Sequence, residues 1–185
     1  DTASKKFIIV HLLGTHTNYK NRYPKKYNFY SDIPQSKFPS ETSFTTINEY
    51  DNSIRYNDYI ISELIELVKG ETSKSEKASL IYFSDHGEDV FETVDFTGHS
   101  ETIGSNPMFQ IPFIFWSNNK VELEKYKDYS DRKYMTDDLI YSIADLANLS
   151  FKGFDNKKSI FSDSFIERTR IIRGNVKYDS FYKNK

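Results

Sequence analysis

Four histidines and one Asp-His pair are the side chains of this sequence best suited to chemistry. Asp85 stands directly before one of the four in "SDHGED", and the histidines are His11, His16, His86 and His99. Because the 185 residues include no cysteine, disulfides and thiolate zinc sites are excluded, and a metal would need His, Asp, Glu or hydroxyl ligands. Imidazole and carboxylate together form a donor set that Zn²⁺ accepts.

A zinc ion held by such ligands suits phosphoryl chemistry. It lowers the pKa of a bound hydroxyl and polarises a phosphoryl oxygen, and two ions about 4 Å apart can clamp both oxygens of an in-line displacement. Arg22, in the loop after His16, is a cation able to bind the remaining phosphate oxygens of a substrate. Lys20 is interpreted instead as a solvent-facing charge.

Each residue taken alone also has an ordinary structural interpretation. A single His beside an Asp is usually a hydrogen-bonded pair or a helix cap. His11 lies inside an apolar run and fits a core histidine, a support for a metal ligand, or a substrate contact. The neighbouring carboxylates are interpreted as solvated loop residues: Glu88, Asp89, Asp95 and Glu101.

Three apolar runs are the elements expected to position the histidines. Residues 6–14 ("KFIIVHLLG"), 79–84 and 111–116 are β-branched, aromatic or otherwise apolar almost throughout. Such runs are typical of strands buried on both faces, as in a parallel sheet. Two long irregular stretches, 15–40 and 85–110, follow the first two runs, and long loops in a compact domain are often functional.

The positions of three histidines relative to these runs favour the metal site. His16 comes just past the first run, Asp85 and His86 just past the second, and His99 in the loop after it. Because ligands bind at the carboxyl ends of parallel strands, we expect these four residues to converge at one edge of the sheet.

Helices are expected between the strands. Apolar residues recur at steps of three and four through 45–70, which predicts a long amphipathic helix closed by Gly70. Residues 135–150 predict a second helix with Thr136 as its N-cap, and 168–174 a last, edge strand. The alternation predicts an α/β fold with a largely parallel sheet flanked by helices.

Composition limits the partners and the domain count. Lys plus Arg total 25 and Asp plus Glu total 27, so the net charge of −2 gives no basic footprint for nucleic acid. No apolar run reaches the ~18 residues needed to span a bilayer. The length suits a single domain over residues 1–185, whose tail, 151–185, carries little pattern.

Four ordered blocks carry a resemblance to a known family. They are "VHLLGTHTNYKNRYP" (10–24), "YDNSIRYNDYIISELI" (50–65), "YFSDHGEDVFETVDFTGHSE" (82–101) and "IPFIFWS" (111–117). Together they resemble the phosphoethanolamine transferases of Gram-negative bacteria, members of the alkaline phosphatase and sulfatase superfamily. The wording "HLLGTH" and "DFTGHSE" is most similar to the branch that modifies the lipopolysaccharide core, and the resemblance runs from about residue 7 to about residue 150.

The resemblance implies a sulfatase-like layered fold and a membrane-anchored enzyme of the bacterial inner membrane, with its catalytic domain in the periplasm. A Thr nucleophile would take phosphoethanolamine from phosphatidylethanolamine and pass it to a lipopolysaccharide acceptor, either core or lipid A, with one or two Zn²⁺ ions rather than Mn²⁺. By motif matching, Asp85 and His86 fall on ligands of the ion that activates the nucleophile. His16 and His99 fall on contacts to a second ion or the phosphoryl group, and His11 near the substrate headgroup.

The sequence also departs from the family pattern. In the family the nucleophilic Thr and an acidic metal ligand precede the "GTH" block, whereas here that block is preceded by few residues. Thr15, Thr17 and Thr97 do not stand at the nucleophile's position. We therefore expect no catalytic nucleophile in this chain, which would be the C-terminal half of a catalytic domain, inactive alone and preceded by a transmembrane region.

Several other interpretations stay open at the level of sequence. A sulfatase or a phosphoglycerol transferase of the same superfamily would share the metal residues, although "NRYP" after "GTH" favours the phosphoethanolamine transferase. A non-catalytic fragment would show no tight metal site. A carbohydrate- or lipid-binding module would not need histidines gathered at strand ends.

Overall fold

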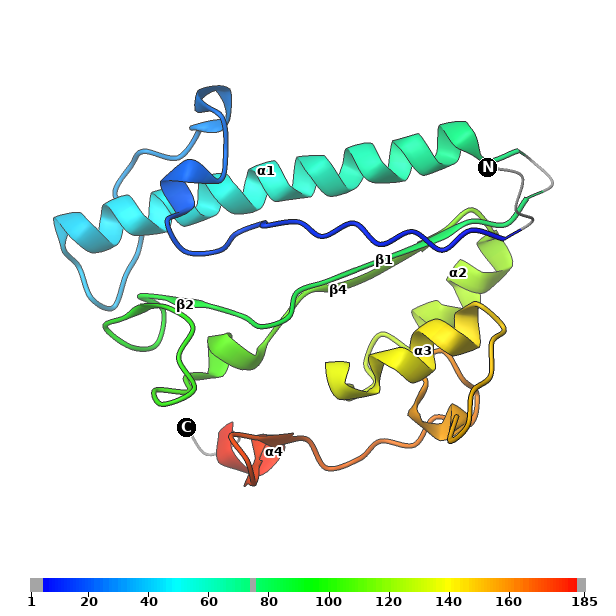
Figure 1. Ribbon diagram of the computed structural model, residues 1–185. Helices are drawn as coiled ribbons and strands as arrows, with labels where there is room; N and C mark the ends of the chain where they lie inside the picture. The colour runs from blue at the N-terminus through cyan, green and yellow to red at the C-terminus, as the bar shows by residue number, and fades with distance from the viewer. Residues whose placement is uncertain (1–4, 74–75, 183–185) are drawn as a thin grey trace. The chain divides into compact units, whose positions relative to one another are not determined.

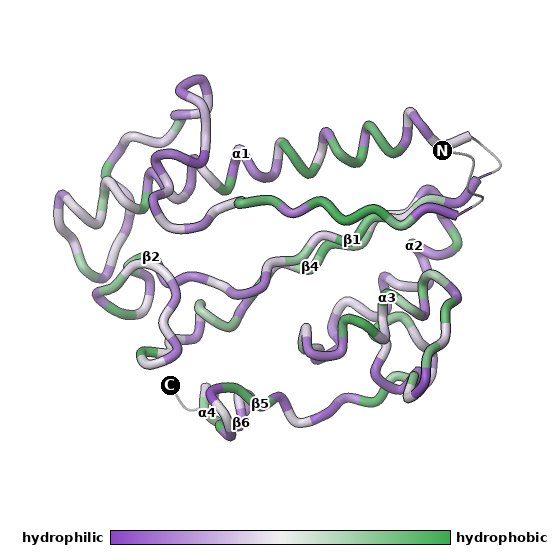
Figure 2. Tube along the Cα trace, viewed as in Figure 1, coloured by the Kyte–Doolittle hydropathy of each residue, from purple (hydrophilic) through white to green (hydrophobic). Residues whose placement is uncertain are grey.

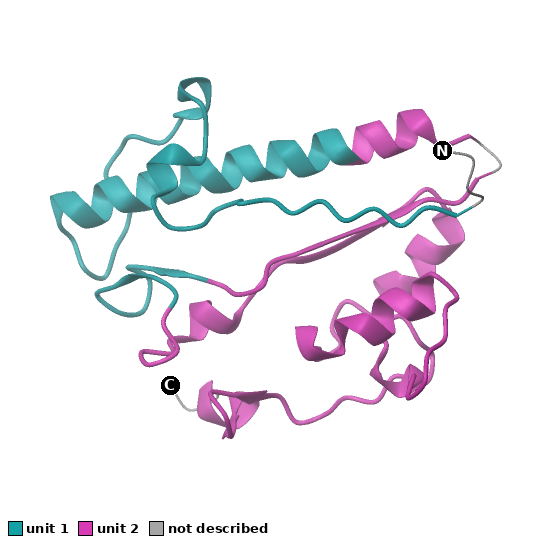
Figure 3. Cartoon of the chain, viewed as in Figure 1, with its two compact units in different colours: residues 1–64, 88–99 teal, residues 65–87, 100–185 magenta. Residues whose placement is uncertain are grey.

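The chain forms two compact units in the computed structural model, which describes residues 5–73 and 76–182 (Figures 1 and 3). The first unit comprises Asp1–Leu64 and Glu88–His99, and the second comprises Ile65–Gly87 and Ser100–Lys185. The prediction of a single domain over 1–185 stays a prediction.

A 31-residue helix, α1 (Glu41–Glu71), confirms the helix predicted over 45–70 and contributes to both units. Its start is fixed by two serines: the backbone N–H of Ser43 donates to Ser40 Oγ at 3.0 Å, and that of Ser40 donates to Ser43 Oγ at 2.9 Å. This reciprocal pattern satisfies backbone donors that a helix N-terminus leaves unpaired. Among the described residues, no helix combines the length and apolar character that crossing a membrane requires.

A buried asparagine of α1 fastens the long loop of the first unit. The loop contains two short 3₁₀ helices, η1 (Tyr19–Asn21) and η2 (Lys25–Tyr27). Asn52 is 1% exposed, and its Oδ1 accepts hydrogen bonds from the backbone N–H groups of Phe29 (2.7 Å) and Tyr30 (2.9 Å). Its Nδ2 donates to the Tyr30 carbonyl at 3.0 Å, so one side chain replaces backbone pairing that the irregular loop lacks.

The strand predicted at 6–14 is wrong for the described residues, where the structure assigns this run no strand. Most of its side chains are exposed, with Phe7 at 68%, Ile8 at 76% and Ile9 at 79%. Figure 2 shows the run as one of the most hydrophobic stretches of the trace. A strand forms only when its backbone hydrogen-bonds to a neighbouring strand. Apolar composition favours burial of the side chains but does not specify which strand would pair with this run.

A two-stranded hairpin completes the first unit. The strands β2 (Asp89–Val90) and β3 (Thr97–Gly98) pair antiparallel, with Asp89 opposite Gly98 and Val90 opposite Thr97. Phe91 and Phe96 also share a hydrogen bond across the hairpin, from the Phe91 N–H to the Phe96 carbonyl at 3.0 Å. The stretch directly before His99 is therefore a hairpin with a defined register, although the sequence pattern there predicted neither strand.

The central pair of strands lies in the second unit. The strands β1 (Ser79–Phe83) and β4 (Phe113–Ser117) match the apolar runs at 79–84 and 111–116. They pair antiparallel, with Ser79 opposite Ser117 and Phe83 opposite Phe113, and the described strands of the two small hairpins are antiparallel as well. The expected parallel pairing is thus wrong for these strands, because a continuous apolar run indicates burial on both faces and leaves strand direction open.

Short elements fill the rest of the second unit. They are η3 (Asn106–Phe109), α2 (Lys120–Lys127), η4 (Thr136–Asp138), α3 (Leu139–Leu146), η5 (Asn156–Lys158), β5 (Ile171–Ile172), β6 (Val176–Lys177) and α4 (Tyr178–Tyr182). The helix predicted over 135–150 divides into η4 and α3, so that Met135 and Asp138, rather than Thr136, occupy the N-cap positions. The edge strand predicted at 168–174 shortens to β5, which pairs with β6.

Aromatic side chains form the core of the second unit, and one of them, Phe161, comes from the tail. Phe161 is 5% exposed, and its ring centroid lies 5.0 Å from that of Phe115, 4.9 Å from Tyr126 and 6.4 Å from Phe113. Aromatic residues bury large areas of apolar surface. The described part of the tail, residues 151–182, is therefore part of the folded unit, although its sequence carries little pattern.

Candidate metal centre

The Asp85–His86 pair occupies a tight turn directly after β1, as the sequence predicted. Ser84 Oγ donates to the His86 carbonyl at 2.7 Å, and the His86 N–H donates to Asp85 Oδ1 at 3.1 Å. The Asp85 side chain is 87% exposed, the His86 side chain 31%, and Asp85 Oδ2 lies 3.9 Å from His86 Nε2. The turn therefore presents a carboxylate and an imidazole side by side.

The tautomer of the His86 ring follows from a second contact. Its Nδ1 lies 3.0 Å from the carbonyl oxygen of Gly87. A carbonyl accepts and cannot donate, so this bond requires the hydrogen on Nδ1, and the tautomer that fits the contact carries its lone pair on Nε2. Histidines that bind metals commonly donate their second N–H to a backbone carbonyl in this way.

Gly87 fixes the turn by close backbone packing. A Cβ at this position would clash with the carbonyl oxygens of Pro107 and Gln110. The Gly87 N–H also donates to the carbonyl of Met108 at 3.1 Å, and Met108 is fully buried. Only glycine fits at this position of "SDHGED", because the backbone of residues 107–110 packs directly against it. This packing fixes the Asp85–His86 turn.

The chain's last described residues support the same loop. Tyr182 Oη donates to the Gly104 carbonyl, and Tyr178 Oη donates to Asn106 Oδ1 at 2.8 Å. Arg173 Nη2 donates to the carbonyl of Thr102 at 3.0 Å. Sequence reasoning missed this role of the tail, because tyrosines and an arginine in a polar segment give no signal of their distant partners.

His16 lies in an exposed turn of the first unit whose carbonyls are bound by Arg22. Arg22 Nε donates to the His16 carbonyl at 3.0 Å, and its Nη2 donates to the Thr17 carbonyl at 2.9 Å. Thr17 Oγ1 lies 3.1 Å from His16 Nδ1. Arg22 was predicted to bind substrate, which stays a prediction; in the structure its guanidinium holds the backbone beside His16.

His99 follows the β2–β3 hairpin, which a buried carboxylate organises. Asp89 is fully buried, and its Oδ1 accepts from the backbone N–H groups of Glu92 (2.9 Å) and Thr93 (3.2 Å). Its Oδ2 accepts from the Thr93 hydroxyl. The expectation that Asp89 is a solvated loop residue is wrong, because a charge buried with several donors is stabilised by them in place of water.

Tyr19 is a buried residue of this region that sequence reasoning missed. It is 3% exposed, and its hydroxyl donates to Glu88 Oε2 and lies 3.4 Å from Thr97 Oγ1. Burial, followed by the hydrogen bond to Glu88, raises the pKa of Tyr19, so the phenol stays a neutral donor at physiological pH. Glu88 was also expected to be solvated, and its bond to a buried phenol corrects that expectation.

His11 differs from the other histidines in its surroundings. It is exposed and lies in the run at 6–14 that forms no strand among the described residues. Its predicted contact with the substrate headgroup stays a prediction.

The candidate ligands divide between the two units. His16 and His99 belong to the first, and Asp85 and His86 to the second. Within the part of the chain that the structure describes, no three His, Asp or Glu side chains are gathered as a metal site. The donors nevertheless fit zinc, since they comprise imidazoles and a carboxylate, and His86 keeps its lone pair on Nε2. The four-residue zinc site therefore stays a prediction.

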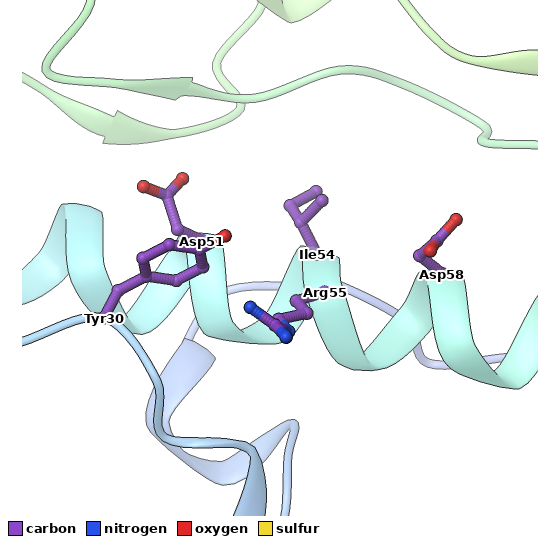
Figure 4. Close-up of a pocket in the computed structure, with 5 residues that line it drawn as sticks. All are labelled: Tyr30, Asp51, Ile54, Arg55 and Asp58. Carbon is purple, nitrogen blue, oxygen red and sulfur yellow. The ribbon is translucent and has the colours of Figure 1, made fainter.

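An open hollow on α1 contains none of these residues. Figure 4 shows its lining, which consists of Tyr30, Asp51, Ile54, Arg55 and Asp58. The Arg55 guanidinium lies 3.8 Å from the centre of the Phe29 ring, a cation–π contact. Burial, and then the neighbouring Asp32, raises the pKa of Asp51 above its ordinary value. The hollow joins a cation to two carboxylates on the helix surface and lacks the histidines that phosphoryl chemistry would use.

Comparison with known proteins adds a family and a set of relatives. The family model described as Sulfatase matches residues 1–149. The chain is 39% identical to the phosphoethanolamine transferase EptC of Escherichia coli in an alignment 187 positions long, which covers 93% of this chain and 30% of that relative. The chain thus spans about a third of the length of this curated relative.

Solved structures give the same result at the level of fold. The C-terminal periplasmic domain of EptC from Escherichia coli matches with a TM-score of 0.88 and 35% identity, covering 100% of this chain and 56% of that one. A structure of the same domain in complex with Zn matches with a TM-score of 0.87 and 36% identity, covering 97% of this chain and 53% of that one. The predicted sulfatase-like fold is confirmed.

Proposed function

The chain belongs to the Sulfatase family, and from this premise we propose that the complete protein carrying it transfers phosphoethanolamine to a lipopolysaccharide acceptor. The observation that carries the proposal is the likeness to EptC, which extends over 93% of the chain in sequence and 100% in structure. The donor in this proposal is phosphatidylethanolamine. The acceptor sugar is in the core or in lipid A.

Zinc is the proposed cofactor, as one or two ions. The Zn complex of the EptC domain supports a zinc ion in a relative, and the donor types of Asp85, His86, His16 and His99 suit the same metal rather than Mn²⁺. When bound, zinc would supply Lewis acidity toward a phosphoryl oxygen and lower the pKa of a coordinated hydroxyl. The Nδ1 bond of His86 to Gly87 would orient that ring for coordination.

The reaction proposed is a double displacement. An oxygen nucleophile of the complete protein, expected to be a Thr upstream of this chain, forms a bond to phosphorus while the bond from phosphorus to the diglyceride oxygen breaks. An acceptor hydroxyl then displaces that nucleophile, and each step is easier than a single direct transfer. His11 and Arg22 would contact the phosphoethanolamine group, and Arg22 brings a charge already fixed beside His16.

The proposed location is the bacterial inner membrane, with these residues in the periplasm. The matching EptC structures are of a periplasmic domain, which supports this location. A chain that spans 30% of the relative would leave the membrane anchor to the remainder of the complete protein.

The proposal is tested by mass spectrometry of lipopolysaccharide. The complete protein is expressed in a bacterium that lacks phosphoethanolamine on its lipopolysaccharide, beside its His86→Ala variant and a Lys20→Ala control. We expect the mass of one added phosphoethanolamine with the wild type and with Lys20→Ala, and none with His86→Ala. An unchanged mass with well-expressed wild-type protein would contradict the proposal.

A sulfatase is the second candidate, because the matching family model carries that description. It would use the same metal residues and release sulfate from an ester. Sulfate release from an aryl sulfate by the complete protein, without modification of lipopolysaccharide, would favour this alternative.

A further inference from the structure

We propose that Tyr19 is a positioning residue, which holds the segment of His16 against the hairpin that carries His99 and thereby sets the metal affinity of the site. This inference rests on the proposed function, since it assigns His16 and His99 to a metal centre. It concerns the first unit alone, where all of its contacts lie.

The hydroxyl of Tyr19 lies at the meeting point of three sequence segments. Tyr19 comes three residues after His16, and its hydroxyl donates to Glu88, the second residue after His86. The same hydroxyl lies 3.4 Å from the hydroxyl of Thr97, the second residue before His99. The phenol of Tyr19 therefore contacts one residue that is close in sequence to His86 and one that is close in sequence to His99.

The hairpin gives these contacts a defined geometry. Asp89 lies opposite Gly98, so continuing the antiparallel register by one residue places Glu88 opposite His99. The buried carboxylate of Asp89 ties the turn of the hairpin through Glu92 and Thr93. Tyr19 thus binds the open end of a hairpin whose other end is already fixed.

Close packing supports the same junction. Gly98 adopts a φ of +109°, and a Cβ there would come within 3.1 Å of Thr17 Cγ2, tighter than ordinary van der Waals contact. The Tyr19 ring also packs edge-to-face on Tyr50 of α1, with centroids 5.0 Å apart at 69°. The ring is therefore anchored on the helix and its hydroxyl is directed to the hairpin.

The expected effect of removing the Tyr19 hydroxyl on zinc affinity follows from its hydrogen bond to Glu88. Tyr19→Phe keeps the ring packing and removes the donor, which leaves the half-buried Glu88 carboxylate without this hydrogen bond. Residues that orient metal ligands typically change metal affinity by about 10- to 100-fold when they are altered. We expect a loss of about 10-fold for Tyr19→Phe, because the ligands themselves remain.

The test compares variants of the complete protein by two readouts. Competition with a chromophoric chelator gives the Zn²⁺ affinity, and the visible spectrum of the Co²⁺-loaded protein reports ligand geometry. The variants are Tyr19→Phe, Glu88→Ala, Glu88→Gln and the double variant Tyr19→Phe with Glu88→Ala. Tyr23→Phe is the matched control, because it removes a hydroxyl that donates to Asn28 at 3.2 Å in the same loop.

Each outcome supports or overturns the inference. We expect weaker Zn²⁺ binding and an altered Co²⁺ spectrum for Tyr19→Phe and Glu88→Ala, near-normal behaviour for Glu88→Gln and Tyr23→Phe, and no further loss in the double variant. Wild-type affinity and spectrum in Tyr19→Phe, or losses that multiply in the double variant, would overturn the role of Tyr19 while the proposed function stands. Absence of metal binding by the wild type would overturn both.

Discussion

The two units hold their candidate ligands in different ways. In the second unit, the Asp85–His86 turn is fixed by backbone packing, with Gly87 pressed against the 107–110 backbone. In the first unit, the segments of His16 and His99 are tied by side chains, chiefly Tyr19, Arg22 and Asp89. Backbone packing leaves no room for an added atom, whereas hydrogen bonds can be removed one at a time. The comparison predicts abrupt effects in the second unit and graded effects in the first.

The largest effect is expected at Gly87. Gly87→Ala places a methyl group against two backbone carbonyls, which cannot rotate away as a side-chain end could. We expect a loss of about 3 kcal/mol in the free energy of unfolding, measured by urea denaturation of the purified chain.

Gly70→Ala is the matched control for this substitution. A Cβ at Gly70 meets no described atom within 4 Å, and the residue lies in α1. Alanine should therefore stabilise the helix by about 0.5–1 kcal/mol. If the two variants unfolded at the same urea concentration, backbone packing at Gly87 would not constrain the turn.

A smaller loss of unfolding free energy is expected when Asp89 in the first unit is replaced. Asp89→Ala removes the acceptor of three hydrogen bonds that form the hairpin turn. Removal should cost about 2 kcal/mol of unfolding free energy. Asp95 is an exposed carboxylate of the same turn, so Asp95→Ala should change the free energy of unfolding by less than about 0.5 kcal/mol. Equal losses in the two variants would contradict the role of the buried carboxylate.

The smallest effect is expected from alkaline pH in the second unit. Burial raises the pKa of Tyr134 from 10.0 to about 12, although its hydrogen bond with Ser142 acts in the opposite direction. The unfolded chain therefore loses this proton first, and stability present below pH 10 is lost as the pH rises toward 12. We expect the free energy of unfolding to fall by about 1 kcal/mol over this pH range in the wild type and not in Tyr134→Phe. Urea denaturation of both proteins at a series of pH values measures the difference. Parallel pH profiles for the two proteins would refute this effect.

The features that the sequence predicted correctly are local ones. The helix over 45–70 and the strand over 79–84 follow from residue patterns within one segment, and α1 and β1 confirm them. The position of Asp85 and His86 at a strand end follows from the same apolar run.

The features that sequence reasoning missed depend on partners far along the chain. Tyr19 and Glu88 are separated by 69 positions, and no residue pattern near either one indicates the bond between them. The burial of Asp89 follows from a turn that forms around its carboxylate. Strand direction at β1 and β4, and the absence of a ladder for residues 6–14 among the described residues, likewise depend on neighbours that apolar composition does not specify.

The most direct test of the central claim is zinc-dependent release of diglyceride from fluorescent phosphatidylethanolamine by the complete protein. We expect product with the wild type, loss of product after chelation and recovery with added Zn²⁺. We expect no product with His86→Ala and none from residues 1–185 alone. Diglyceride release that persists after chelation and in the His86→Ala variant would contradict the metal-dependent transfer proposed for the complete protein.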